Sequence, residues 1–173
     1  KQIDALAKKM GVGRPSIGPW LQMLCEVVER IPHAMLITDM RVPGLPLARA
    51  SAEFARLAGL RAPRAALGRN CRFLQGGETQ AYLVEELSAA VRDARAAVVR
   101  MWNYTAAGRR FHCLVAVHPV FARGGGDAPR FTVGVQVELD FDAEDGVVAR
   151  VAALERALAL LPRSLDGADE RDA

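Results

Sequence analysis

The sequence is short of several residue types that define large classes of protein. Only three cysteines occur in 173 residues, and their wide spacing suits neither a disulfide framework nor a zinc site. All three lysines fall within the first nine residues, so no basic stripe for nucleic acid runs along the chain. No secretory signal and no apolar run of about 18 residues are present. These absences favour a cytoplasmic protein without a membrane span or a metal site.

What is present is enough apolar sequence for one domain with extensions. Hydrophobic residues make up 51% of the chain, which allows a sizeable core. The net charge of +3 is too small to indicate a particular partner.

Apolar periodicity predicts an α+β domain at residues 34–140. Two strands are expected first, then helices, then three more strands, which indicates an antiparallel sheet with helices on one face. Ser51 suits the N-cap of the first of these helices. The expected strands are 34–39, 45–50, 96–105, 110–121 and 130–140. One helix is expected directly after Ser51, a short one at 63–67 and a longer one at 79–94.

Helical extensions are expected on both sides of this domain, at 1–33 and 141–173. Each carries an apolar seam at alternating spacings of three and four residues. A helix with such a seam must bury it against another surface. The seams therefore predict a homodimer through the N- and C-terminal helices, or packing on the back of the chain's own sheet. The seam residues are Trp20, Leu24, Val27 and Ile31, and then Val147, Val151, Leu154, Leu158 and Leu161.

The N-terminal stretch LAKKMGVGRPSIGPWL also resembles a helix-turn-helix, which gives an alternative hypothesis of DNA binding. Gly18 and Pro19 would interrupt its second helix, and Arg14 is that helix's only cation. Nucleic acid is therefore an unlikely partner. The positions that fit the motif are Ala7, Gly11, Val12 and Ile17.

The most distinctive segment is GRNCRFLQG, residues 68–76, in which one thiol lies between an amide and a guanidinium. On its residues alone, Cys71 could serve as a nucleophile, a metal ligand, a redox group or a core residue. The segment resembles the signature of LOV domains, the blue-light-sensing branch of the PAS fold. ITD at 37–39, NYTAAGRRF at 103–111 and VGVQ at 133–136 follow the order and spacing of that family. The resemblance implies a five-stranded antiparallel PAS sheet.

The resemblance also implies a photoreceptor that is a reversible switch and not an enzyme. In that family a noncovalently held flavin absorbs blue light, the cysteine sulfur bonds to ring carbon C4a, N5 takes a proton, and the adduct decays thermally. The short segment after the cysteine motif favours FMN, with FAD and riboflavin as alternatives. A PAS-type sensor that binds its ligand without photochemistry is the remaining alternative.

By resemblance, Cys71 is the photoreactive thiol, Arg72 binds the flavin phosphate and Asn103 binds the polar edge of the ring. Gln136 should face N5, and because an amide has a donor end and an acceptor end, it can reorient when N5 gains a proton. The residues expected around the cofactor are Thr38, Asn70, Cys71, Arg72, Leu74, Gln75, Val84, Leu87, Val91, Met101, Asn103, Cys113, Val115, Val117, Gly134 and Gln136.

Four positions depart from the family pattern. Leu45 stands where a ribityl-contacting Asn is usual, and Ser88 stands where a second phosphate-binding Arg is usual. Cys113 replaces a ring-binding Asn, and Thr132 replaces an aromatic residue. Arg92, one helical turn after Ser88, is a candidate substitute for the missing cation.

Overall fold

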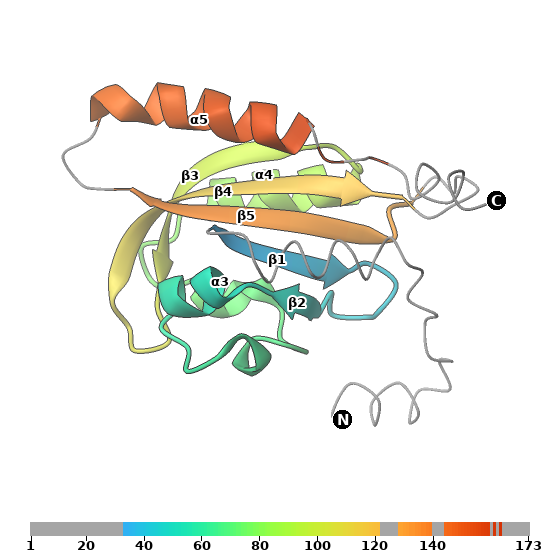
Figure 1. Ribbon diagram of the computed structural model, residues 1–173, viewed down its shortest axis with the longest axis horizontal. Coiled ribbons are helices and arrows are strands. Elements are labelled where there is room, and N and C mark those ends of the chain that lie inside the picture. Colours follow the sequence, from blue (N-terminus) through green and yellow to red (C-terminus); the bar gives the residue numbers. More distant parts are fainter. Residues whose placement is uncertain (1–32, 122–127, 140–143, 160, 162, 164–173) are drawn as a thin grey trace.

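The protein, described here from a computed structural model, is built on a five-stranded antiparallel sheet with the order β2-β1-β5-β4-β3 (Figure 1). The structure describes residues 33–121, 128–139, 144–159, 161 and 163. The N-terminal seam, the helix-turn-helix-like stretch and the polar C-terminal tail lie outside these residues. The strands are β1 (Ala34–Asp39), β2 (Leu47–Ala50), β3 (Ala97–Tyr104), β4 (Arg110–Val120) and β5 (Phe131–Leu139).

The first helices gather on one face of the sheet. Apolar side chains from that face, including Leu36, Met101 and Val115, form one core cluster with Phe54 and Leu57. This confirms the expected α+β arrangement. The elements on this face are α3 (Ala52–Leu57), the short 3-10 helices η1 (Pro63–Ala65) and η2 (Cys71–Leu74), and α4 (Ala81–Arg92).

Ser51 ties the N-terminus of α3 to the start of β1. Its hydroxyl accepts hydrogen bonds from the backbone N–H groups of Phe54 and Met35, each at 3.0 Å, and donates to the carbonyl of His33 at 2.8 Å. The side chain is fully buried, so these bonds satisfy a polar group that would otherwise be costly. The N-cap predicted from sequence is confirmed.

The opposite face of the sheet is covered by α5 (Glu144–Ala159), which runs along β3 and β4 in Figure 1. Leu154 and Leu158 of the C-terminal seam are buried against this face, 9% and 3% exposed. Met35, Leu114 and Val133 belong to the same cluster. Of the two fates expected for this seam, the structure shows packing on the chain's own sheet.

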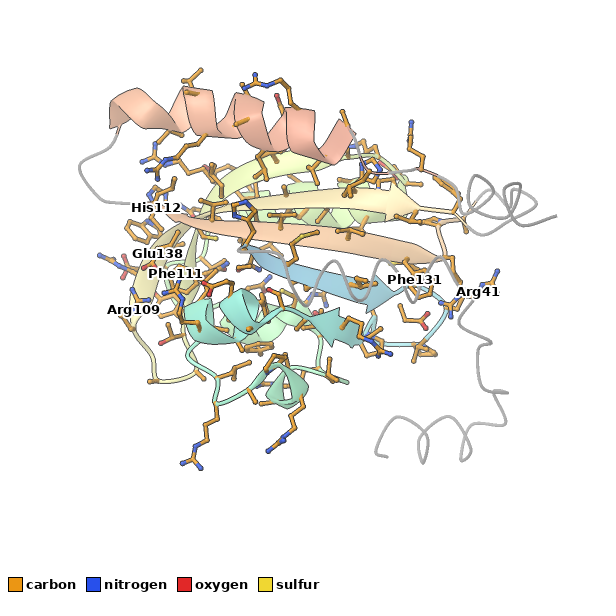
Figure 2. The ribbon with its side chains drawn as sticks, viewed as in Figure 1. Arg41, Arg109, Phe111, His112, Phe131 and Glu138 are labelled. Carbon is orange, nitrogen blue, oxygen red and sulfur yellow. The ribbon has the colours of Figure 1, made fainter. Side chains whose placement is uncertain are left out.

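Two arginine–carboxylate pairs bind strands together at the ends of the sheet. Figure 2 shows Arg109 beside Glu138, with their atoms Nη1 and Oε1 2.6 Å apart, at one end, and Phe131 at the other end. Near Phe131, Arg130 forms an ion pair with Asp39. The Arg130 and Asp39 side chains are only 11% and 13% exposed, whereas Arg109 and Glu138 are 56% and 36% exposed.

None of the helices among the described residues is both long enough and apolar enough to cross a lipid bilayer.

Candidate functional site

The cysteine motif is held in place by β2 and α3. Gly68 adopts a left-handed conformation, with φ of 78°, which glycine tolerates without steric cost. Its N–H donates to the carbonyl of Leu47 at 2.9 Å, and the N–H of Leu47 donates to the carbonyl of Arg69 at 2.8 Å. Phe73 packs edge-on against Phe54, with ring centroids 6.5 Å apart. The motif is therefore fixed on both sides of Cys71.

Asn70 caps the start of η2 and links this helix to the loop before β2. Its Oδ1 accepts from the backbone N–H of Arg72 at 3.0 Å, which makes Asn70 the N-cap of η2. Its Nδ2 donates to the carbonyl of Gly44 at 2.7 Å. The amide that sequence reasoning placed against the cofactor thus also ties two loops together.

A cavity of about 360 Å³ lies between this motif, α4 and the sheet. That volume falls in the range of roughly 300–1,000 Å³ typical of small-molecule sites. The cavity is lined by Leu36, Thr38, Met40, Leu45, Asn70, Cys71, Arg72, Gln75, Val84, Leu87, Ser88, Val91, Arg92, Met101, Asn103, Val115, Val117, Thr132, Gly134 and Gln136.

Nearly all the residues expected around a cofactor meet in this lining. Leu74 and Cys113 are the two expected residues outside it, and both are fully buried in the core cluster of the same face. Sequence reasoning missed Leu36 and Met40. Both share the parity of Thr38, and side chains two residues apart on a strand point to the same face, so this signal could have found Leu36.

The departures from the family pattern also meet in the cavity. Leu45, Ser88 and Thr132 all line it, and so does Arg92, the suggested substitute cation. Thr132 Oγ1 lies 3.2 Å from the sulfur of Met40.

The charged side chains lie at the exposed part of the cavity, and neutral amides lie in its buried part. The side chains of Arg72 and Arg92 are exposed, while Asn103 and Gln136 are each only 3% exposed. Between these polar groups, α4 and the sheet supply aliphatic walls. A ligand that suits this lining has a flat apolar body, a buried edge with donors and acceptors, and an anionic end near solvent.

The Cys71 thiol lies beside a buried amide. Gln136 Nε2 is 3.5 Å from Cys71 Sγ. Burial raises the pKa of Cys71 to about 12, although the Gln136 contact lowers it somewhat. The thiol therefore keeps its proton at neutral pH, so it is not a preformed thiolate nucleophile.

Gly134 leaves room on the floor of the cavity. A Cβ at this position would lie 2.7 Å from Cδ1 of Leu36, closer than carbon atoms approach. Because Leu36 and Gly134 are cross-strand partners that both line the cavity, a larger residue at 134 would push Leu36 into it.

Comparison with known proteins agrees with this geometry. The PAS domain family matches residues 32–137. The structure is similar to the crystal structure of a Rhodobacter sphaeroides LOV protein, with 33% identity and a TM-score of 0.69, covering 79% of this chain and 76% of that one. The chain belongs to the LOV family of PAS domains.

This LOV domain also resembles parts of larger proteins. It is 36% identical over 115 residues to phototropin-2 of Oryza sativa subsp. japonica. These aligned residues make up 66% of this chain and 12% of the relative. It is 39% identical over 97 residues to a blue-light-activated histidine kinase of Rhizobium johnstonii. The aligned residues make up 56% of this chain and 28% of that relative. The LOV chain thus spans less than a third of these curated relatives.

Proposed function

We propose that this LOV domain is a blue-light photoreceptor that holds a flavin in the cavity and uses Cys71 as its photoreactive thiol. The observation that carries the proposal is the position of the Cys71 thiol, which lines a cavity of flavin-compatible polarity and lies 3.5 Å from the Gln136 amide. The similarity to phototropin-2 and to a blue-light-activated histidine kinase supports it.

The residues present fit a flavin. The isoalloxazine ring is flat and apolar on its faces, which suits Val84, Leu87 and Val115 in the lining. Its pyrimidine edge carries carbonyl and N–H groups, which need both donors and acceptors. The amides of Asn103 and Gln136 offer both and are otherwise expensive to bury.

Cys71 supplies both a sulfur and a proton. A bound flavin supplies absorption of blue light and, once excited, a ring carbon that takes the sulfur and a ring nitrogen that takes the proton. Because burial raises the pKa of the Cys71 thiol to about 12, the thiol is protonated in the resting state. We therefore expect the light response to persist up to about pH 10, where a thiol of ordinary pKa near 8.5 would be ionised.

Gln136 responds when the ring nitrogen gains a proton. Its amide can donate through Nε2 or accept through Oε1, so it can meet a ring nitrogen before and after that nitrogen gains a proton. Gln136 is on β5, whose neighbouring residues Val135 and Val137 point to the other face and pack in the cluster that contains α5. The proposed output is a change in how α5 docks.

FMN is the flavin that the charged residues favour. Arg72 and Arg92 both line the exposed part of the cavity, and a phosphate can accept charge-assisted hydrogen bonds from either. FAD and riboflavin are the alternatives, and the flavin extracted from purified protein identifies the one that binds.

The role proposed for this region is sensing and not catalysis. The matched part is 28% of a relative named as a kinase, and the described residues form one PAS sheet with the helices that cover it. The proposed partner is a second copy of the chain, through the N- and C-terminal helices, in the cytoplasm.

The experiment is an absorption spectrum of purified protein before and after blue light. Wild type should bind flavin, lose its blue absorbance on illumination and recover it in the dark. Cys71→Ala should bind the flavin and show no reversible loss, because the sulfur is gone. Cys113→Ala is the matched thiol control and should still respond.

Reversible loss of absorbance in Cys71→Ala would contradict the assignment of this thiol. A wild type that binds flavin but does not respond to light would support the alternative of a PAS sensor without photochemistry.

A further inference from the structure

The Gln136 amide lies between two thiols. Its Nε2 is 3.5 Å from Cys71 Sγ, and its Oε1 is 3.9 Å from Cys113 Sγ. Cys113 is fully buried and does not line the cavity. It can therefore affect a ligand in the cavity only indirectly, through its contact with the Gln136 side chain. This arrangement exists because Cys113 stands on β4 two residues before Val115, the cross-strand partner of Gln136.

The single proton of Cys113 has two acceptors within reach. One is Gln136 Oε1, and the other is the backbone carbonyl of Leu114, 3.2 Å from the sulfur. The N–H of Val137 and the amide of Asn103 approach the same sulfur as donors. Burial raises the pKa of Cys113, so the thiol keeps its proton and can donate it. A thiol rotates about a single bond and is both a weak donor and a weak acceptor.

Each orientation of Gln136 therefore has a matching orientation of the Cys113 thiol. With Oε1 toward Cys113, the S–H donates to Oε1. With the amide reversed, Nε2 faces the sulfur, which then accepts from Nε2 while its proton turns to the Leu114 carbonyl. Neither arrangement leaves a buried polar end of Gln136 opposite an apolar group.

We propose that Cys113 is a positioning residue that hydrogen-bonds Gln136 in both orientations of its amide and so sets how readily that amide turns. The proposal rests on the proposed photoreceptor function. No bond to sulfur forms or breaks at Cys113, because its proton stays on the sulfur and changes only its acceptor.

The consequence is kinetic. The S–H bond to an amide oxygen is the better of the two, because sulfur is a poor acceptor. In the reversed arrangement, however, the thiol makes two bonds, one from Nε2 and one to the Leu114 carbonyl, so removing it weakens both arrangements of the amide. We therefore expect Cys113→Ala to change the rate of thermal recovery by about two- to tenfold, the factor that one hydrogen bond represents.

The decisive readout is the S–H stretching region of the light-minus-dark infrared spectrum. Wild type should show two changes, loss of the Cys71 S–H band and a frequency shift of the Cys113 band. Cys113→Ala should keep the loss and lack the shift. Cys113→Ser also lacks the shift, but its hydroxyl can rotate between the same acceptors, so its recovery should lie within about twofold of wild type.

Two results would overturn the proposal. One is a wild-type spectrum in which only one S–H band changes, and the other is a Cys113→Ala recovery rate equal to that of wild type. If Cys113→Ala fails to fold, the wild-type and Cys113→Ser spectra decide. A wild type that shows no light response at all would instead refute the photoreceptor function, so the two failures can be told apart.

Discussion

At the scale of single residues, Leu45 carries a conformational cost. Its φ of 50° lies in the left-handed region, which costs a residue with a branched side chain roughly 1–2 kcal/mol. Asparagine, the residue usual at this position in the family, adopts this region more readily because its short polar side chain can bond locally. The departure at Leu45 therefore affects the backbone as well as the polarity of the cavity.

Leu45→Asn should raise the free energy of unfolding of the flavin-free protein by about 1 kcal/mol, because the strain is relieved. Ala94 follows the C-cap residue of α4 with φ of 53°, so Ala94→Gly offers a control with the same cause. Urea unfolding of both variants measures the effect. If Ala94→Gly stabilises and Leu45→Asn destabilises, the packing of Leu45 outweighs its strain.

The cationic end of the cavity, where the arginines lie, gives a second test at this scale. Ser88 lines the cavity together with Arg72 and Arg92, so Ser88→Arg adds a third cation. We expect FMN to bind about ten- to a hundredfold more tightly, the factor for one charge-assisted hydrogen bond of about 1.5–3 kcal/mol. Riboflavin, which lacks the phosphate, should bind as before.

Fluorescence titration of both flavins into flavin-free protein measures the change. Arg92→Gln is the matched variant, and it should weaken FMN but not riboflavin if Arg92 substitutes for the missing arginine. Equal effects of Ser88→Arg on both flavins would show that position 88 does not approach the phosphate.

How far these residue-level features could be predicted from sequence depends on whether they are local. The resemblance to LOV domains, which the cysteine motif and the three strand motifs carry, predicted most of the residues that line the cavity. The bonds from Asn70 to the carbonyls of Gly44 and Leu45 join positions about 25 residues apart, and no local pattern encodes them. The approach of Cys113 to Gln136 also depends on the β4–β5 register, which the sequence alone does not fix.

At the scale of elements, two ion pairs test what burial contributes to strand pairing. Arg130 and Asp39 join the start of β5 to the end of β1 and are mostly buried, whereas Arg109 and Glu138 are largely exposed. Breaking a buried pair leaves an unpaired charge away from water, which costs far more than breaking an exposed one.

Arg130→Met should lower the free energy of unfolding by about 3 kcal/mol, because the Asp39 carboxylate loses its partner in a mostly buried site. Arg109→Met removes the same charge from the exposed pair and should cost less than about 1 kcal/mol. Chemical denaturation of both variants provides the comparison. Similar losses in the two variants would show that burial does not separate these pairs.

Element boundaries could be predicted well where alternation was strong and less well where backbone geometry intervened. β1 begins and ends at the predicted residues because its apolar run is bounded by turn signals. β2 was predicted from 45 but begins at Leu47, because the left-handed Leu45 cannot continue a strand. α5 lies within the predicted C-terminal extension and carries the predicted seam, yet that seam pattern suits its own sheet as well as a second helix.

At the scale of the whole molecule, α5 closes the face of the sheet opposite the cavity. If release of α5 is the output, its seam must come off the sheet and become available to another surface. Leu154 is buried on the sheet, whereas Val148 on the same helix is 78% exposed. These two positions separate the intramolecular contact from a contact with a second copy.

Leu154→Glu should detach α5, because a buried charge without a partner costs several kcal/mol. We expect a lower free energy of unfolding and faster amide exchange in β4 and β5. Val148→Glu, the control, should leave both unchanged and should lower dimer content if the exposed side of α5 contacts a second copy. Gel filtration in the dark and under blue light measures the assembly state.

If Leu154→Glu changes neither stability nor exchange, α5 does not protect the sheet as described. A wild type that is monomeric both in the dark and under light would contradict the proposed homodimer, while leaving the photochemistry unaffected.

The alternation of side chains along β5 has a consequence for protein engineering. Gln136 faces the cavity, while its neighbours Val135 and Val137 belong to the cluster beneath α5. One inserted or deleted residue in this strand would exchange the two faces, so the cavity would receive a valine and α5 an amide. Anyone who fuses this domain to another protein can vary the length of the linker after α5, but must preserve the residue count of β5.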